Sequence, residues 1–253
     1  MSQSKDPLTI LITGASSGIG RALALNYARS GVQLFLQGRD PDRLKASALA
    51  CRSKGASVET DVLDVTDRSA MAAWILRSDK RDLLDLVIAN AGVSGQSDDQ
   101  PDTVRWMFKV NLEGVLNTIE PAMPAFLARG HGHIAIMSSL AGFRGMPTAP
   151  GYTASKAAAR CYGEGLRGKL MKEGVDVSVI CPGFVKTPMT DDNPFPMPLM
   201  MEPGKAAKII RRGLDRRAAR IAFPLRLYAA MRLFAALPPA WVDPLLQRFQ
   251  GKE

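Results

Sequence analysis

Tyr152 and Lys156 stand four positions apart in the segment Gly-Tyr-Thr-Ala-Ser-Lys. If this segment is helical, both side chains lie on one face, one turn apart. An ammonium group beside a phenol favours the phenolate and lowers the phenol pKa from its usual value of about 10. Such a phenol can give a proton to a carbonyl or take one from an alcohol. Ordinary surface pairs show the same spacing, so the interpretation depends on the rest of the chain.

A glycine-rich segment near the N-terminus has the composition of a phosphate-binding turn, placed between a strand-like run and a helix-like run. Its three glycines permit a tight turn, a close approach to a pyrophosphate and close packing of helix on sheet, and the helix amides then face the phosphates. The residues expected to contact the dinucleotide are Gly14, Ser16, Ser17, Gly18, Ile19 and Gly20. The spacing GxxxGxG departs from the common GxGxxG, and an ordinary strand-to-helix turn is the alternative.

The end of the second predicted strand bears on the choice of nucleotide. A domain that prefers NAD places an acidic residue about 20 positions after the glycine turn, on the ribose diol. Here the segment reads Gln37-Gly38-Arg39-Asp40. Gly38 leaves room and Arg39 offers a guanidinium fork to a 2′-phosphate, whereas Asp40 is equally suited to cap the next helix. The sequence therefore favours NADP(H) over NAD(H).

Short apolar runs alternate with longer amphipathic runs along the first two thirds of the chain. Strands are predicted at Thr9–Thr13, Gln33–Gln37, Ser57–Asp61, Leu84–Ala89, Gly132–Ser138 and Asp176–Cys181, with an edge strand at Arg220–Phe223. Helices are predicted at Ile19–Ser30, Asp42–Ser53, Asp67–Arg77, Asp102–Met123, Tyr152–Glu173 and Lys205–Leu214. This alternation predicts an α/β fold, a doubly wound parallel seven-stranded sheet with helices on both faces. A single domain over 1–253 is expected, with a core at 8–190, a substrate loop at 188–204 and a basic tail at 205–253.

The bulk composition, 253 residues with 46% hydrophobic and 23% charged side chains, is that of an ordinary globular protein. Cys51, Cys161 and Cys181 are far apart and form no CxxC pair, which argues against a disulfide framework and fits a reducing compartment. His131 and His133 are expected to be loop residues, and no metal site is predicted. The sequence shows no signal peptide and no apolar run of the ~20 residues that span a bilayer, so a cytoplasmic location is expected.

The glycine turn, the Tyr152/Lys156 pair and several motifs between and after them occur in an order that resembles the short-chain dehydrogenase/reductase family, over about residues 8 to 190. The glycine turn is similar to the family's TGxxxGIG, and Tyr152 with Lys156 is similar to its YxxxK. Ser139 stands thirteen residues before Tyr152, where the family has its catalytic serine, and Asn111 stands where it has its catalytic asparagine. The other matches are Asp64-Val65 at the adenine end, Asn90-Ala91-Gly92 after the fourth strand, and Pro182-Gly183-Phe184-Val185-Lys186-Thr187 beside the nicotinamide.

The resemblance implies a Rossmann-type oxidoreductase that moves a hydride between a nicotinamide cofactor and a small-molecule carbonyl or secondary alcohol. Tyr152 would exchange a proton with the substrate oxygen, and Ser139 would hydrogen-bond that oxygen. Lys156 would lower the pKa of Tyr152 and hold the nicotinamide ribose, while Asn111 would hold a water in a proton relay to Lys156. The further cofactor contacts implied are Arg39, Asp64, Val65, Asn90, Ala91, Gly92, Tyr152, Lys156, Pro182, Gly183, Val185 and Thr187.

The C-terminal fifth holds nearly all of the net charge of +9, because eleven Lys or Arg residues stand against three Asp or Glu residues from Lys205 to Glu253. The run from Phe223 to Leu237 is helical in composition and mostly apolar. Apolar and aromatic residues mixed with Arg resemble a helix that lies on an anionic membrane. The preferred alternative is a tail docked on the substrate pocket or on a neighbouring subunit. No nucleic-acid motif accompanies the charge, so its arginines are read as a solvated face or as an attractant for an acidic substrate.

The helix after Tyr152 bears on assembly. In the resembled family this helix is often buried between subunits, and Gly163, Gly165 and Gly168 would let two backbones approach closely. A homodimer or homotetramer is expected, with a poorly formed helix as the alternative.

Two other functions stay open. One is a membrane-peripheral reductase of a lipid or cell-envelope polysaccharide precursor. The other is a catalytically silent nucleotide-binding sensor or scaffold, which the complete set Asn111, Ser139, Tyr152 and Lys156 argues against.

Overall fold

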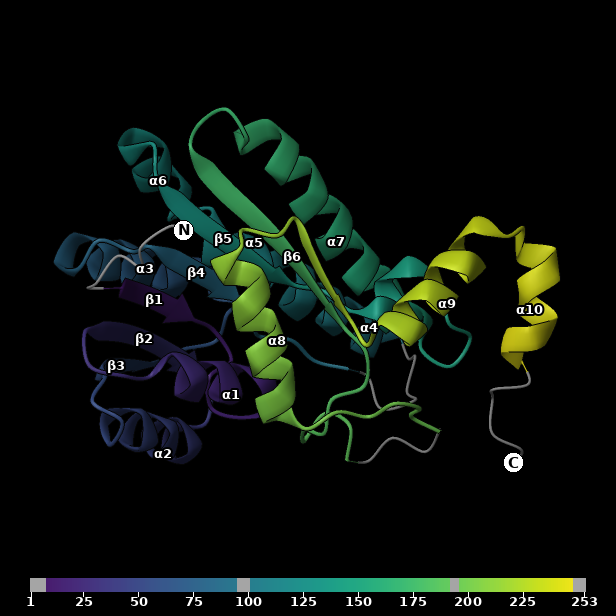
Figure 1. Ribbon diagram of the computed structural model, residues 1–253, viewed down its shortest axis with the longest axis horizontal. Coiled ribbons are helices and arrows are strands. Elements are labelled where there is room, and N and C mark those ends of the chain that lie inside the picture. The colour runs from purple at the N-terminus through teal and green to yellow at the C-terminus, as the bar shows by residue number, and fades with distance from the viewer. Residues whose placement is uncertain (1–7, 95–100, 192–195, 248–253) are drawn as a thin grey trace.

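The computed structural model describes residues 8–94, 101–191 and 196–247. Within these residues lies a seven-stranded sheet of order β3-β2-β1-β4-β5-β6-β7, and every neighbouring pair runs parallel (Figure 1). The strands are β1 (Leu8–Ile12), β2 (Val32–Gly38), β3 (Ser57–Val62), β4 (Leu86–Ala89), β5 (Gly132–Met137), β6 (Val175–Pro182) and β7 (Arg220–Phe223). The prediction of a parallel seven-stranded sheet, edge strand included, is confirmed.

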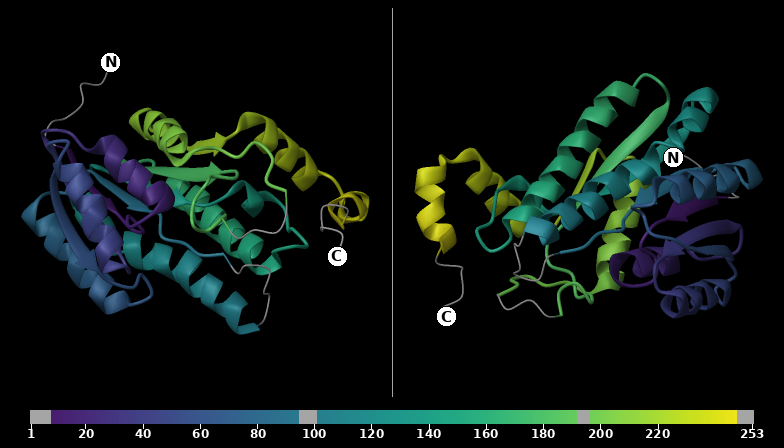
Figure 2. Two further views of the ribbon diagram at one scale, coloured as in Figure 1. Left: turned by 90° about the horizontal axis from the view of Figure 1, so that it is seen from below. Right: turned by 180° about the vertical axis from the view of Figure 1, so that it is seen from behind.

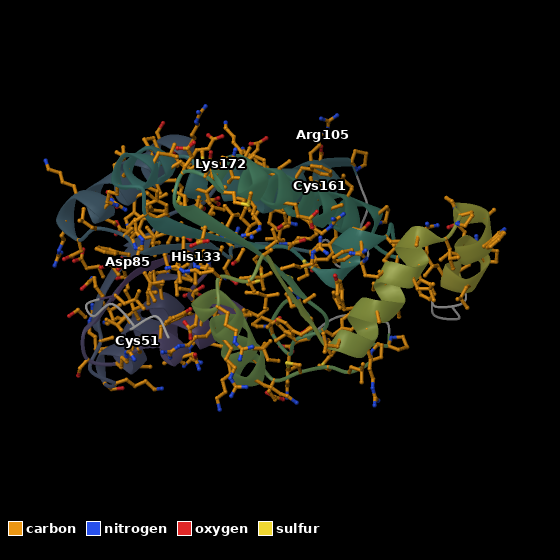
Figure 3. The ribbon with its side chains drawn as sticks, turned by 45° about the horizontal axis from the view of Figure 1, so that its top comes forward. Cys51, Asp85, Arg105, His133, Cys161 and Lys172 are labelled. Atoms are coloured by element: carbon orange, nitrogen blue, oxygen red, sulfur yellow. The ribbon has the colours of Figure 1, made fainter. Side chains whose placement is uncertain are left out.

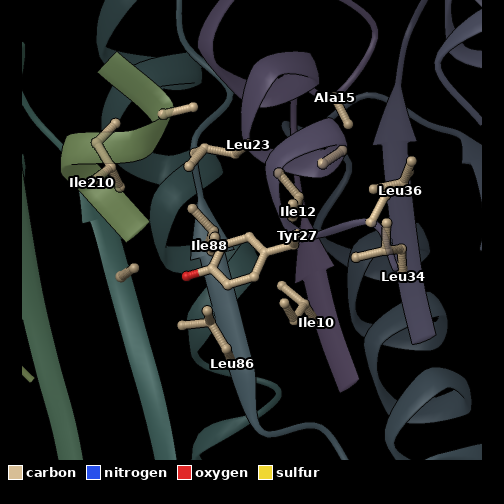
Figure 4. Packing of buried hydrophobic residues seen from close by; sticks show 14 of the residues in the cluster. Ile10, Ile12, Ala15, Leu23, Tyr27, Leu34, Leu36, Leu86, Ile88 and Ile210 are labelled. Carbon is tan, nitrogen blue, oxygen red and sulfur yellow. The ribbon is translucent and has the colours of Figure 1, made fainter. Parts of the chain in front are cut away.

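Helices cover the sheet on both faces, as a parallel sheet requires. One face carries α1 (Gly18–Tyr27), α2 (Pro41–Arg52) and α8 (Pro203–Asp215), and the other carries α3 (Arg68–Arg81), α4 (Pro101–Phe108), α5 (Gly114–Ile119), α6 (Met123–Arg129) and α7 (Pro150–Leu170) (Figure 2). In Figure 4, Leu23 and Tyr27 of α1 and Ile210 of α8 lie against Ile10 and Ile88 of the sheet. All five side chains are buried, so burial of these apolar faces fixes the helices on the strands.

Short polar side chains begin two of these helices. The Asp40 carboxylate accepts a hydrogen bond from the Arg43 amide at 2.9 Å, and the Asp67 carboxylate accepts one from the Ala70 amide at 3.0 Å. Both satisfy amides that have no partner inside the helix. Asp40 is therefore the N-cap of α2, one of the two roles that the sequence leaves open.

The helical stretch after β4 differs from its prediction as one helix over 102–123. It consists of α4, a π-helical turn η1 (Lys109–Glu113) and α5. Asn111 is the central residue of the turn. Such π-turns interrupt a helix by one wider turn and are frequent at functional sites. Amphipathic periodicity does not reveal them, because the sequence pattern continues through the interruption.

The prediction that His133 is a loop residue is wrong. It lies in β5, buried, close to Asp85 (Figure 3), and its Nε2 lies 2.9 Å from Ser178 Oγ. Since the Ser178 hydroxyl donates to the Ala218 carbonyl at 2.7 Å, the imidazole must be the donor to that oxygen. Burial, with a smaller contribution from Arg217, lowers the pKa of His133 to about 3. His133 is thus a neutral core residue.

Gly163, Gly165 and Gly168, the three glycines of α7 expected at a subunit contact, do not share one face. A methyl group at Gly163 would lie 2.6 Å from the Val179 side chain, so Gly163 faces the sheet and not a second subunit. No atom lies within 4 Å of a methyl group built at Gly165 or Gly168. The expectation of a close backbone approach between subunits therefore fails for Gly163 and remains open for the other two.

Of the predicted tail at 205–253, most of α8 and all of β7 belong to the layers of the sheet, and only α9 (Leu225–Ala236) and α10 (Pro239–Gln247), called the tail from here on, lie beyond the carboxyl ends of the strands (Figure 1). Met231 and Leu246 are buried, so one face of the tail docks on the body. Leu225, Leu233 and Trp241 are 74%, 58% and 72% exposed on the other face. In the described parts of the chain, no helix has the length and apolar character needed to span a membrane.

Candidate active site

A cavity of about 810 Å³ opens at the carboxyl ends of β1, β4, β5 and β6. In open parallel sheets this edge is where ligands bind, beside the point at which the strand order reverses. Here the order reverses between β1 and β4. Every predicted site residue lines the cavity except Gly20 and Asn111.

The glycine turn is held by a residue that sequence reasoning missed. The Gly14 amide donates to Gln37 Oε1 at 3.1 Å, and the Ala15 amide donates to the Gln37 main-chain carbonyl at 2.8 Å. The Gln37 amide group donates in turn to the Leu63 carbonyl. Gln37 is 1% exposed, so its side chain has no water to bond. A polar amide at the end of an otherwise apolar strand is the signal that identifies it.

Gly20 does not line the cavity but packs closely against the glycine turn. A methyl group there would lie 2.2 Å from the Gly14 carbonyl oxygen and 2.5 Å from Asn90 Nδ2. The Asn90 side chain donates to the Thr13 carbonyl at 2.9 Å, which joins the turn to the end of β4. Any larger residue at position 20 would therefore push the turn out of shape.

The N-terminus of α1 points its amides at the cavity, which Gly18 and Ile19 line. Ser17 is the N-cap residue but makes no side-chain hydrogen bond to the helix. Helix amides without a capping side chain, together with the positive end of the helix dipole, suit a phosphate group. The residues present therefore fit the pyrophosphate of a dinucleotide.

The part of the cavity beside the ends of β2 and β3 is lined by polar and charged side chains. Arg39 is exposed at the end of β2, and Asp64 accepts a hydrogen bond from the Thr66 amide at 2.8 Å. Burial raises the pKa of the Asp64 carboxyl, but the bonds from Thr66 and the charge of Arg39 outweigh it and hold that pKa below its usual range. The Asp40 carboxylate is engaged by the Arg43 amide and by Arg43 Nε at 3.1 Å. Arg39 and Arg43 are thus the cations at this end of the cavity, with Arg43 paired to Asp40, the cap of α2.

Tyr152 and Lys156 lie one turn apart near the start of α7, and Ser139 follows β5. Lys156 is 3% exposed, and its Nζ donates to the Met137 carbonyl at 3.2 Å. Burial lowers the pKa of Lys156 to about 8. The Ser138 hydroxyl donates to the Lys156 carbonyl at 2.8 Å and so ties α7 to the end of β5.

The expected lowering of the Tyr152 pKa by Lys156 is not found. Burial raises the pKa of Tyr152, and a hydrogen bond with the Ser139 side chain opposes that rise. Lys156 Nζ lies 5.9 Å from the centroid of the Tyr152 ring and is engaged with the Met137 carbonyl. Desolvation is therefore the main influence on the Tyr152 pKa in this arrangement, and the hydrogen bond with Ser139 is the one that opposes it.

Asn111 is fully buried behind the cavity. Its Nδ2 donates to the Val93 carbonyl and to Ser155 Oγ, both at 2.9 Å, and its Oδ1 accepts from the Val93 amide at 2.8 Å. A methyl group at Gly92 would lie 3.0 Å from Lys156 Nζ and 3.1 Å from Asn111 Oδ1. Asn111 and Lys156 therefore flank the same small residue, and Ser155, which sequence reasoning missed, links Asn111 to α7.

Beyond Tyr152 the cavity is lined in part by the loop after β6 and by α9 and α10. Within the predicted substrate loop at 188–204, Pro188 and Met189 line the cavity, whereas Met197, Met200 and Met201 do not. Met201 instead pairs with Val185 and packs on the core. Among the described residues, no group of three His, Cys, Asp or Glu side chains is placed to hold a metal ion.

The family model described as short chain dehydrogenase matches residues 8–195. A Myxococcus xanthus protein described as an uncharacterized oxidoreductase is 39% identical over 246 residues, which cover 96% of this chain and 97% of that protein. A short-chain dehydrogenase from Sphingobium yanoikuyae, solved in complex with NADPH, is 28% identical with a TM-score of 0.79, covering 97% of this chain and 98% of its own. A short chain dehydrogenase from Mycobacterium paratuberculosis, solved bound to NAD, is 26% identical with a TM-score of 0.75, covering 86% and 96%.

Proposed function

The chain belongs to the short-chain dehydrogenase family of NAD(P)-dependent oxidoreductases, and we propose that it uses NADP(H) to interconvert a carbonyl compound and a secondary alcohol. Tyr152 is the general acid/base. The observation that carries the proposal is that Ser139, Tyr152 and Lys156 line the same cavity as the glycine turn.

Tyr152 gives its phenolic proton to the carbonyl oxygen in the reducing direction and takes it back in the oxidising direction. When bound, the nicotinamide supplies or accepts the hydride. The raised pKa of Tyr152 keeps its proton on the phenol at neutral pH, as a proton donor needs. Ser139, which hydrogen-bonds the phenol, orients the substrate oxygen between the two hydroxyl groups.

Lys156 restores the proton of Tyr152. Its pKa of about 8 lets the ammonium group exchange protons close to neutral pH. Asn111 holds the bridging water, and it does so through Oδ1 or its main-chain carbonyl, because Nδ2 already donates to Val93 and Ser155. This modifies the role expected for Asn111, whose side chain also anchors the strand end at Val93.

NADP(H) is proposed over NAD(H) because of the charges at the end of β2. Arg39 is exposed and lines the cavity, whereas the Asp40 carboxylate is bonded to the Arg43 amide and guanidinium group at the start of α2. A guanidinium group suits a 2′-phosphate, and a ribose diol would need an acceptor here. Of the two solved relatives described above, one is bound to NADPH and the other to NAD.

We propose a homodimer or homotetramer in which α7 lies between subunits. Its outer face carries Gly165 and Gly168, with open space beside both, and the exposed thiol of Cys161. On the neighbouring α4, Trp106 is 40% exposed. Small residues beside an exposed aromatic side chain suit a packed helix interface.

We propose as a second candidate that the protein lies in the cytoplasm and makes peripheral contact with an anionic membrane. This candidate rests on the outer face of α9 and α10. Leu225, Leu233 and Trp241 are exposed on it. The sequence of α9 includes Arg226 and Arg232 and no acidic residue. Apolar and aromatic side chains with arginine favour an anionic lipid surface.

We predict that Tyr152→Phe lowers kcat at least about 10²-fold while NADPH binding stays nearly unchanged, because the phenyl ring keeps the packing and loses the proton. Steady-state kinetics and fluorescence titration with NADPH measure the two effects. Turnover retained by the variant would refute the assignment of Tyr152. A wild-type chain that binds NADPH but turns over no carbonyl would favour the sensor or scaffold.

Arg39→Ala should raise the Kd for NADPH roughly 10- to 100-fold, the effect of losing a charge-assisted contact to a phosphate. The Kd for NADH should hardly change, which serves as the internal control. An equal rise in the Kd values for NADPH and NADH would mean that Arg39 does not bind the 2′-phosphate.

Vesicle flotation tests the membrane contact. The full-length chain should float with vesicles that contain phosphatidylserine and not with phosphatidylcholine alone, because the attraction is partly electrostatic. The double substitution Leu233→Ser with Trp241→Ser should abolish flotation. Leu76→Ser, at a side chain 54% exposed on α3, is the matched control and should float. Flotation that survives the double substitution, or is absent throughout, contradicts the proposal.

A further inference from the structure

We propose that the substrate is an uncharged, largely apolar ketone or secondary alcohol, and that the inner face of α9 determines this specificity. The inner face of α9 denotes Leu227, Ala230, Met231 and Phe234. The proposal rests on the proposed function, since it names the substrate class of the same site.

Charge is divided unevenly along the cavity. Four charged residues, Arg39, Asp40, Arg43 and Asp64, line it where β2 and β3 end. Beyond Tyr152, the described lining residues include no charged side chain other than Lys156. Val93, Leu140, Met146, Phe184 and Met189 are representative of this part, and its polar groups are neutral hydroxyls such as those of Ser94 and Thr148.

A substrate charge in this part would have no counter-charge among the described residues. Removing an ion from water without a partner is unfavourable by far more than burial of an apolar group is favourable. The lining therefore selects against carboxylates, phosphates and ammonium groups, and in favour of hydrocarbon on either side of the reacting carbonyl.

The tail supplies one wall of this part through a regular helical face. Leu227, Ala230, Met231 and Phe234 stand at i, i+3, i+4 and i+7, the spacing that brings side chains to one side of a helix. Met231 is 7% exposed and packs with Leu140, which follows Ser139. The wall thus begins beside the catalytic serine.

A cluster around Glu164 that includes two arginines, Arg220 of β7 and Arg160 of α7, holds this wall in place, and neither arginine lines the cavity. Arg220 pairs with Glu164 of α7 and donates to the Tyr228 hydroxyl at 3.0 Å, while Arg160 pairs with the same carboxylate at 3.0 Å. The Phe143 ring lies beneath both guanidinium groups, at 4.6 Å from Arg160 and 5.4 Å from Arg220. Four elements meet in this cluster: α7, the 3₁₀-helical turn η2 (Leu140–Phe143), β7 and α9.

A second contact fastens the far end of the tail. Arg144 Nη2 lies 3.0 Å from Asp243 Oδ1 of α10, and Arg144 Nη1 donates to the Phe234 and Leu237 carbonyls at 3.4 Å and 3.3 Å. None of Arg211, Arg212, Arg216, Arg217 and Arg220 lines the cavity. These arginines therefore do not face a substrate in the cavity, and for Arg220 the ion pair with Glu164 is a structural role.

The test uses the full chain with NADPH and two matched ketones, 4-phenyl-2-butanone and its para-carboxylate. Binding is measured by calorimetry on the complex with NADP⁺, which cannot reduce the ketone, and turnover with NADPH is measured as kcat/KM. The neutral ketone should be preferred at least about tenfold in both, which corresponds to about 1.4 kcal/mol. Equal binding and turnover of the two ketones would overturn the inference and leave the proposed function intact.

Substitutions on α9 test whether its inner face causes the preference for the neutral ketone. Ala230→Asp should lower kcat/KM for the neutral ketone at least about tenfold, and Ala230→Lys should shift the preference toward the carboxylate. The controls Ala229→Asp and Ala229→Lys lie one residue away on the exposed side of α9 and should behave as wild type. NADPH binding and Tm should be retained in all four variants, which shows that they fold.

The outcomes separate the two claims. If position 230 has no more effect than position 229, the inner face of α9 does not determine specificity and the inference fails. Selective binding of the neutral ketone without turnover supports the inference and counts against the proposed function. Absence of binding and of turnover for both ketones counts against the inference.

Discussion

Parallel pairing of the strands is the constraint on which the site depends. Each strand of a parallel sheet starts at the same edge, so every segment that follows a strand begins at the opposite edge. The glycine turn after β1, Arg39 after β2, Asn90 after β4, Ser139 after β5 and Gly183 after β6 converge there for this reason. Residues spread over most of the chain thus reach one cavity, and contacts such as the hydrogen bond from Asn90 to the Thr13 carbonyl then join the loops that carry them.

Burial, which stabilises the sheet and its helices, also shifts the pKa values of the two ionisable groups of α7 at the site. Lys156 and Tyr152 stand on a helix whose neighbours are apolar, and loss of water lowers the pKa of the lysine and raises that of the tyrosine. Lysine and tyrosine have similar ordinary pKa values, about 10.4 and about 10, so these shifts move their proton affinities apart. The Lys156 ammonium is then the stronger acid of the two and gives its proton favourably to a Tyr152 phenolate, which suits a relay in which Lys156 returns the proton to Tyr152.

Features that depend on local pattern were predictable from the sequence, and features that depend on packing were not. The seven strands, the glycine turn and the spacing of Ser139, Tyr152 and Lys156 follow from periodicity and motif. The π-turn at Asn111, the inward side of Gly163 and the support of Gly14 by Gln37 depend on which neighbour each residue meets. The role of the tail could not be read either, since the same arginines suit solvent, lipid or Glu164 until their partners are known.

The dependence of ketone reduction on pH tests the central claim, that a buried Lys156 returns the proton given up by Tyr152. If Lys156 is that donor, kcat/KM for reduction is flat at neutral pH and falls about tenfold per pH unit above about 8, where its ammonium loses the proton. The Lys156→Met enzyme should lack this step and be slow throughout. A wild-type rate that stays constant to about pH 10, with Tyr152 still protonated, would contradict the account.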